Sequence, residues 1–211
     1  MILKRKIYKK LLEWKKECQG KKALLIEGAR RIGKSTICEE FGKSEYKSFL
    51  LIDFAKKDKE VEGYFEKYLN DLDTFFMLLQ THFGTKLTER NSLIIFDEVQ
   101  MFPQARAAIK YLVADGRYDY IETGSLISIR ENVKNIVIPS EERHINMYPL
   151  DFEEFAIALE EDLLVEYIKK CFEKREPLER SMHNQAMLLF HQYMLVGGIL
   201  SGKVHLSAGR L

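Results

Sequence analysis

Residues 23–41 read ALLIEGARRIGKSTICEEF, and they carry the strongest indication of the fold in the chain. Residues 23–27 are mainly apolar without alternation, which is typical of a strand buried on both faces. The segment GARRIGKS that follows, residues 28–35, has the pattern G-x-x-x-x-G-K-[ST]. Residues 35–41 have a helical pattern, so the loop lies between a strand and a helix. This is the context in which the pattern indicates a phosphate-binding loop.

The chemistry of such a loop explains its residue types. Glycines let successive backbone N–H groups curl around phosphate oxygens, and the N-terminus of the following helix adds positive potential. Lys34 is expected to reach the β- and γ-phosphates, and the Ser35 hydroxyl to coordinate Mg²⁺. The residues expected to contact the nucleotide are Gly28, Ala29, Arg30, Arg31, Ile32, Gly33, Lys34, Ser35 and Thr36.

Two arginines inside the loop, Arg30 and Arg31, need a separate explanation. They are expected to contribute backbone N–H groups, with side chains that project from the loop surface. Those side chains could pair with an acidic group such as Glu98 or Asp53, or meet a neighbouring subunit or partner. The simple alternative is that they are solvated charges that raise the local positive potential.

A second motif, SLIIFDEV at residues 92–99, has four apolar residues that run into Asp97 and Glu98. Asp97 is expected to hold Mg²⁺ directly or through water, and Glu98 to orient and deprotonate an attacking water. On its own, this pattern also fits a buried strand that ends in a solvated acidic turn. Beside a phosphate-binding loop the functional interpretation is favoured, so the sequence predicts an ATP site with Mg²⁺.

The segment YDYIETGS, residues 118–125, matters through its position. An acidic pair on the third strand suggests a sheet in which the fourth strand lies between the first and the third. The carboxyl end of the fourth strand would then face the γ-phosphate, because ligands bind at the carboxyl ends of parallel strands. Ser125 is expected to sense the γ-phosphate, with Thr123 as second choice. A polar exit from the strand is the alternative.

Strand and helix patterns alternate through the first 150 residues. The expected strands are 23–27, 47–55, 92–99, 118–125 and 145–150, and the expected helices before residue 150 are 3–16, 35–41, 59–83 with a break near Asp71, and 103–114. This alternation predicts a largely parallel sheet, hence an α/β fold. After Pro149 the patterns are helical only. They begin with a capping box of Asp151 and Glu154 and continue over 163–175 and 178–196.

Composition limits the function classes. A chain of 211 residues that is 46% hydrophobic can form one domain with a real core. The net charge of +1 gives no support for nucleic-acid binding. Lysines dominate residues 1–22, which fits a solvated helix face, with a nucleic-acid or anionic-surface patch as the alternative. Three scattered cysteines, no secretory signal and no long apolar run predict a cytoplasmic protein without a membrane segment.

With these motifs in hand, the chain resembles the prokaryotic AAA-type ATPases of the AAA 14 family, which carry a C-terminal domain of unknown function. The features that carry the resemblance are Tyr8, Leu11 (or Leu12) and Trp14, then GARRIGKST, LIIFDEVQ before a proline-led helix, ETGS, and YPLDFEEF at residues 148–155. The resemblance implies an additional-strand P-loop fold (ASCE/AAA-like) with sheet order 5-1-4-3-2, a helical lid after the fifth strand, and ATP with Mg²⁺ as ligands.

The expected division of the chain is an N-terminal helix over 1–20, a P-loop ATPase core over 21–150 and a helical lid region over 151–211. The family pattern F..Y...GG.P is matched by Phe190, Tyr193, Gly197 and Gly198, but Leu200 stands where the proline would be. Relatives continue well beyond this point, so the chain is expected to be a truncated form.

The leading functional hypothesis is an ATPase in which Lys34, Glu98 and Ser125 are catalytic. AAA proteins often take an arginine from a neighbouring subunit, and Arg117, Arg130 and Arg143 are the candidates, so a homo-oligomer or a protein partner is expected. The alternative is a nucleotide-gated binding module that hydrolyses ATP negligibly and recruits a partner. Phosphotransfer to a small molecule is less favoured, because no acceptor-site signature is present.

Overall fold

The computed structural model describes residues 5–125 and 141–198. The chain divides into two units. One contains Met1–Lys6, Arg31–Gly33 and Tyr148–Leu211, and the other contains Ile7–Arg30 and Lys34–Met147. The larger unit holds α1 (Ile7–Cys18), β1 (Ala23–Gly28), α2 (Lys34–Glu45), β2 (Ser48–Asp53), η1 (Phe54–Lys56), α3 (Lys59–Tyr68), α4 (Leu72–Phe83), β3 (Ser92–Asp97), η2 (Val99–Met101), α5 (Pro103–Asp115), β4 (Asp119–Gly124) and β5 (Glu142–Met147).

The five strands form one parallel sheet in the order β2-β3-β4-β1-β5. Read from the other edge, this is the order 5-1-4-3-2, so the predicted fold class and strand order are confirmed. The first strand lies between two strands that come much later in the chain: Leu24 pairs with both Ile121 and Arg143. Consequently, the loops after β1, β3 and β4 leave the sheet at the same edge.

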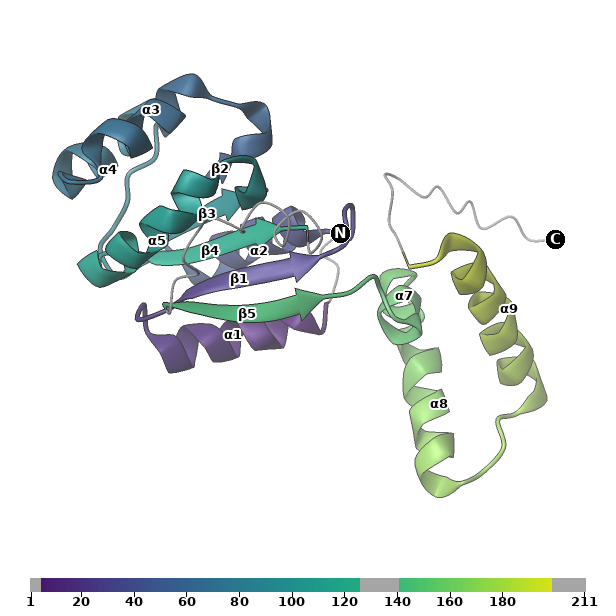
Figure 1. The fold of residues 1–211 in the computed structure, drawn as a ribbon. Helices are drawn as coiled ribbons and strands as arrows, with labels where there is room; N and C mark the ends of the chain where they lie inside the picture. Colours follow the sequence, from purple (N-terminus) through teal and green to yellow (C-terminus); the bar gives the residue numbers. More distant parts are fainter. Residues whose placement is uncertain (1–4, 126–140, 199–211) are drawn as a thin grey trace. The chain divides into compact units, whose positions relative to one another are not determined.

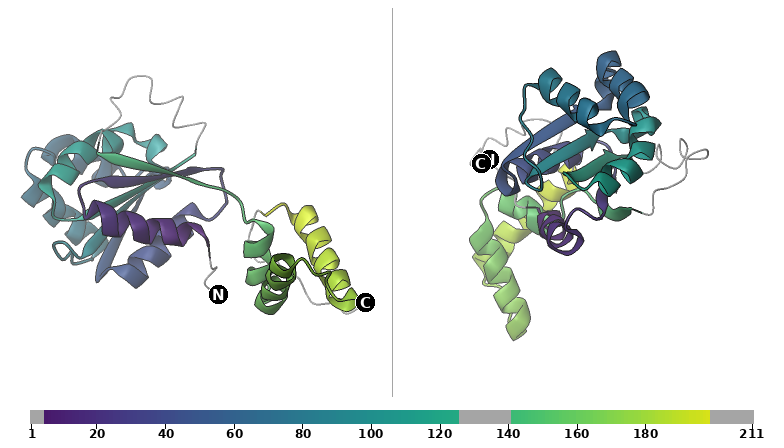
Figure 2. Two further views of the ribbon diagram at one scale, coloured as in Figure 1. Left: turned by 90° about the horizontal axis from the view of Figure 1, so that it is seen from below. Right: turned by 90° about the vertical axis from the view of Figure 1, so that its left-hand side faces the viewer.

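Helices cover both faces of this sheet (Figures 1 and 2). Successive residues of a strand point to opposite faces, so neighbouring apolar positions serve two different cores. On one face, Leu25 and Phe96 join a cluster with residues of α3, α4 and α5. On the other face, α2 packs on the strands, and its Phe41 contacts the ring of Trp14 in α1. Both faces of the central strands are therefore buried, which explains the apolar runs at residues 23–26 of β1 and 93–96 of β3.

The expected fifth strand, 145–150, is displaced in the structure to Glu142–Met147. Its first residue, Glu142, is buried because Arg106 of α5 pairs with it, Nη2 to Oε2 at 2.8 Å and Nε to Oε1 at 3.1 Å. An apolar pattern does not reveal a strand whose buried side chain is a paired charge. The prediction of its boundaries was therefore wrong by three residues.

Other boundaries are set by side-chain caps. The expected break near Asp71 is confirmed, because its carboxylate accepts a hydrogen bond from Thr74 N at 3.2 Å and begins α4. Asp53 accepts one from Ala55 N at 3.0 Å and begins η1. The first helix begins at Ile7 rather than at Leu3, a residue that lies outside the described part of the chain.

The smaller unit holds three helices in its described part: α7 (Phe152–Ala158), α8 (Asp162–Lys174) and α9 (Arg180–Val196). The predicted capping box is confirmed, since Asp151 and Glu154 each accept a hydrogen bond from the other's backbone N–H. Apolar residues of the three helices form a separate cluster, and Tyr193 donates to the Leu150 carbonyl at 3.0 Å. Leu200 lies outside the described residues. Among the described helices, none combines the length and hydropathy that a membrane span requires.

Candidate active site

The loop between β1 and α2 contains the residues predicted to bind phosphate. Two of its residues have left-handed backbones, Arg31 with φ of 63° and Gly33 with φ of 91°. Such a conformation is natural for glycine and uncommon for arginine, which indicates that the loop shape is imposed by its surroundings. The ammonium of Lys34 donates to the carbonyls of Gly28 at 3.2 Å and Ala29 at 2.8 Å. Its charge therefore lies against the loop backbone.

The environment of Lys34 lowers the pKa of its ammonium. Burial is the main cause, and the positive charge of Arg30 acts in the same direction. The carboxylates of Asp97 and Glu98 oppose this effect. A buried cation that faces two carboxylates at a strand edge is suited to receive the negative charge of a polyphosphate.

A carboxylate at the end of β3 connects three elements. Asp97 Oδ1 accepts a hydrogen bond from Ser35 Oγ of α2 at 2.8 Å and another from Thr123 Oγ1 of β4. β3 and β4 are adjacent strands, with Phe96 in register with Glu122, so the residues that follow each of these are brought together. The three side chains therefore meet at the carboxyl end of the sheet, where such folds bind ligands.

Glu98 follows directly and has an unusual backbone, with φ of 53° and ψ of 46°. Its N–H donates to Thr123 Oγ1 at 3.2 Å, and its carboxylate Oε2 accepts a hydrogen bond from Gln100 Nε2. Both ends of the residue are thus held by neighbours. A left-handed non-glycine residue next to the carboxylate that is expected to bind Mg²⁺ is the kind of strained position that clusters at functional sites.

Sequence reasoning missed the contact of Gln100. This residue is 6% exposed, and in the sequence it is only the last residue of the LIIFDEVQ pattern. The signal that could have found it is an amide side chain two residues after the expected base, within reach across one turn. Ser125, the preferred γ-phosphate sensor, follows β4 and is buried. Thr123, the second choice, touches both acidic residues.

The loop arginines, Arg30 and Arg31, are both exposed. Within residues 5–125 and 141–198, neither forms an ion pair with Glu98 or with Asp53. The positive charge of Arg30 lies close enough to contribute to the lowered pKa of Lys34, after burial as the main cause. The roles of both arginines stay predictions.

The three arginines considered as donors to a neighbouring site differ in their surroundings. Arg117 forms an ion pair with Asp73 at 2.6 Å, and Arg143 forms one with Glu17 at 2.5 Å. Arg130 lies outside the described residues. Neither of the two described arginines is hydrogen-bonded to the residues of the candidate site within the described part of the chain.

A divalent cation fits the donor set. The Ser35 hydroxyl and the Asp97 carboxylate offer hard oxygen ligands at one point, which is the chemistry that Mg²⁺ prefers. In the described ranges, no group of three or more His, Cys, Asp and Glu side chains could hold a metal ion. Any Mg²⁺ here would therefore need phosphate oxygens and water to complete its coordination, as is usual at nucleotide sites.

In a comparison with protein-family models, residues 20–156 match the AAA 14 model, which is described as an AAA domain. The match includes β1, the loop, β3 with its two carboxylates, and β4. It ends inside α7, just after Glu154. Among curated proteins, none matches the chain.

Proposed function

Since this chain belongs to the AAA domain family of P-loop ATPases, we propose that it binds Mg·ATP at residues 28–36 and hydrolyses the γ-phosphate. The observation that carries the proposal is the convergence on Asp97 Oδ1 of a hydroxyl from the loop, Ser35, and one from β4, Thr123. This arrangement supports the proposal, because the carboxylate proposed to bind Mg²⁺, the end of the phosphate loop and the proposed base, Glu98, lie at the same end of the sheet.

In this mechanism the loop binds the phosphates through its backbone N–H groups, and Lys34 neutralises charge on the β- and γ-oxygens. Ser35 and Asp97 would hold Mg²⁺, which supplies further neutralisation of the phosphate oxygens when bound. Ser125 at the end of β4 is proposed to contact the γ-phosphate. Most of the barrier to phosphoryl transfer is electrostatic, so these charges act chiefly by being fixed in place.

Glu98 is proposed to orient the attacking water and take its proton. Gln100 and Thr123 act as positioning residues, because one holds the carboxylate and the other holds the backbone N–H of Glu98. A cation from a second copy of the chain or from a partner would complete the charge at the γ-phosphate. We therefore expect the isolated chain to turn over slowly.

The test is steady-state phosphate release with Mg·ATP, compared between the wild type and Glu98→Gln. The substitution keeps the shape of the side chain and removes its basicity, so the rate should fall at least about a hundredfold. Binding of a fluorescent ATP analogue should persist in Glu98→Gln. It should be lost in Lys34→Ala, because this substitution removes the ammonium that is proposed to contact the phosphates.

The outcomes separate the hypotheses. Phosphate release that is unchanged in Glu98→Gln refutes the assignment of the base. Tight binding by the wild type, with no release above background, replaces the ATPase with the nucleotide-gated binding module.

A further inference from the structure

Arg5 reaches the phosphate-binding loop from outside it. The residue is 8% exposed, and its guanidinium donates three hydrogen bonds to three different residues. Nη1 donates to the carbonyl of Ile32 at 3.0 Å, Nη2 to the carbonyl of Tyr148 at 2.7 Å, and Nε to Glu154 Oε1 at 3.2 Å. All four residues belong to the smaller unit. One side chain thus joins the loop to the start of α7.

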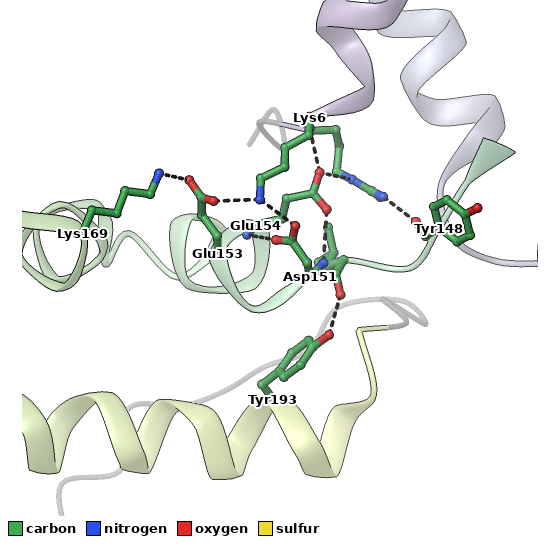
Figure 3. Close-up of polar contacts among 9 residues, drawn as sticks. Lys6, Tyr148, Asp151, Glu153, Glu154, Lys169 and Tyr193 are labelled. Carbon is green, nitrogen blue, oxygen red and sulfur yellow. Dashed lines mark hydrogen bonds and ion pairs between the residues drawn. The ribbon is translucent and has the colours of Figure 1, made fainter. Parts of the chain in front are cut away.

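The carboxylate of Glu154, which pairs with Arg5, is also held by several hydrogen bonds. Besides Arg5, it accepts hydrogen bonds from the backbone N–H groups of Lys6 at 2.7 Å and Asp151 at 3.2 Å. The side chains of Arg5 and Glu154 are 6% and 7% exposed, so this is a buried ion pair with fixed geometry. Figure 3 shows Glu154 among Lys6, Asp151 and Tyr148, at the beginning of α7. Movement of Arg5 would therefore disturb the cap of the helix.

At the other end, the carbonyl that Arg5 holds belongs to the peptide between Ile32 and Gly33. This peptide is planar and trans, as are the others in the described chain, so its C=O and N–H point in opposite directions. A donor fixed on the carbonyl therefore fixes the Gly33 N–H on the side away from Arg5. Hydrogen bonding at the carbonyl also polarises the peptide, which makes the N–H a stronger donor.

We propose that Arg5 is a positioning residue that aims the Gly33 N–H at the nucleotide phosphates and couples occupancy of the loop to the start of α7 through Glu154. The inference rests on the proposed function, because it names a residue that prepares the same site. The phosphates that a loop of this kind cradles with its N–H groups are the α and β ones, so ADP and ATP should report the effect equally.

Lys6 supplies a matched control. Its ammonium pairs with Asp151 at 2.6 Å and with Glu153 at 2.7 Å, both at the start of α7. It is therefore a second cation on the same helix cap, but none of its described hydrogen bonds or ion pairs reaches the loop. Its side chain is 55% exposed, so its pairs should contribute little. Removal of the Lys6 ammonium therefore tests the contribution of the α7 cap without a change at the loop.

The experiment measures the Kd of fluorescent N-methylanthraniloyl-ADP and of its ATP counterpart, with Mg²⁺, for the wild type, Arg5→Met, Arg5→Lys and Lys6→Met. Circular dichroism fixes a temperature at which every variant used is folded. Arg5→Met should bind both nucleotides about ten- to a hundredfold more weakly, the worth of a hydrogen bond to a charged group. Arg5→Lys should be intermediate, because an ammonium lacks the planar fork. Lys6→Met should change Kd less than about twofold.

Several results would overturn the inference. Unchanged Kd values in both Arg5 variants would do so, and so would equal losses in Arg5→Met and Lys6→Met. If Arg5→Met does not fold, Arg5→Lys decides in its place. A wild-type chain that binds neither nucleotide refutes the proposed function, and the inference falls with it. Normal wild-type binding with unaffected Arg5 variants refutes the inference alone.

The coupling has a second readout, because it must be reciprocal. If the loop and α7 are linked through Arg5, ADP should slow amide hydrogen exchange in Phe152–Ala158 of the wild type. In Arg5→Lys, measured at saturating ADP, this slowing should be smaller. Equal slowing in both proteins would show that the nucleotide acts on α7 by another route.

Discussion

Thr123 is the residue whose removal tests the site most sharply. Its side chain is fully buried, and its hydroxyl donates to Asp97 Oδ1 while accepting from the N–H of Glu98 at 3.2 Å. Thr123→Val keeps the shape of the side chain and removes only the hydroxyl. Thr123→Ser keeps the hydroxyl and removes only a methyl group. The pair of variants therefore separates hydrogen bonding from packing.

The expected loss of stability in Thr123→Val follows from the groups that lose a hydrogen-bond partner. A hydrogen bond to a charged group contributes about 1.5–3 kcal/mol, but Asp97 keeps its bond from Ser35, so the lower end applies. The N–H of Glu98 loses its acceptor, which costs about 1 kcal/mol or more at a half-buried position. Thr123→Val should thus lower the free energy of unfolding by about 2–3 kcal/mol. Thr123→Ser should lose about 1 kcal/mol, the worth of one methyl group.

The catalytic consequence should exceed the effect on binding. Release of the Glu98 backbone from its left-handed conformation would displace the base, and a displacement of about 1 Å can cost a hundredfold in rate. Phosphate release by Thr123→Val should fall by about that factor, while its Kd for fluorescent ADP stays within about threefold of the wild type. Urea unfolding monitors stability in parallel. A Thr123→Val protein with wild-type turnover and an unchanged urea midpoint would show that the Thr123 hydroxyl does not hold Asp97 and Glu98 in place.

Two further predictions concern the buried charges beneath α5. Glu142→Gln leaves the guanidinium of Arg106, a side chain that is 4% exposed, without its ionised partner. The substitution should therefore lower the free energy of unfolding by about 3–5 kcal/mol. An unchanged urea midpoint would contradict this prediction. Burial and the nearby charge of Glu142 raise the pKa of Glu122 well above its usual value, so the folded chain keeps a proton that the unfolded chain loses above about pH 4.5. The free energy of unfolding should therefore fall as pH rises from 5, by up to about 1.4 kcal/mol per pH unit. Glu122→Gln should remove this fall. Parallel curves of unfolding free energy against pH for the wild type and Glu122→Gln would contradict the prediction.

The fold was largely predictable because its signals are local. Apolar runs marked the strands, and Asp71 and Asp151 marked helix starts through contacts with residues three positions away. The placement of β4 between β1 and β3 followed from the acidic pair at the end of the third strand. The start of β5 did not follow, because the buried Glu142 pairs with Arg106, a residue far away in the sequence.

The residue types of the candidate site could be predicted from the sequence, but the hydrogen bonds between its side chains could not. The motifs indicated Lys34, Ser35, Asp97 and Glu98, and their roles stay predictions. The hydrogen bond from Gln100 to Glu98 depends on the turn of η2, and the three bonds of Arg5 depend on the chain returning to the loop from residues 148–154. Such contacts between residues distant in the sequence leave no periodic or spacing pattern.

The position of β1 in the sheet has a consequence for how the chain is made. Leu24 is synthesised early, but its two strand partners, Ile121 and Arg143, emerge from the ribosome much later. Until then β1 has neither neighbour, and the loop that it supports cannot take its final shape. Pairings between distant segments also form slowly, because the intervening chain must first be ordered. We therefore expect nascent chains that end before residue 119 to be unable to retain nucleotide, however complete their phosphate-binding motif is.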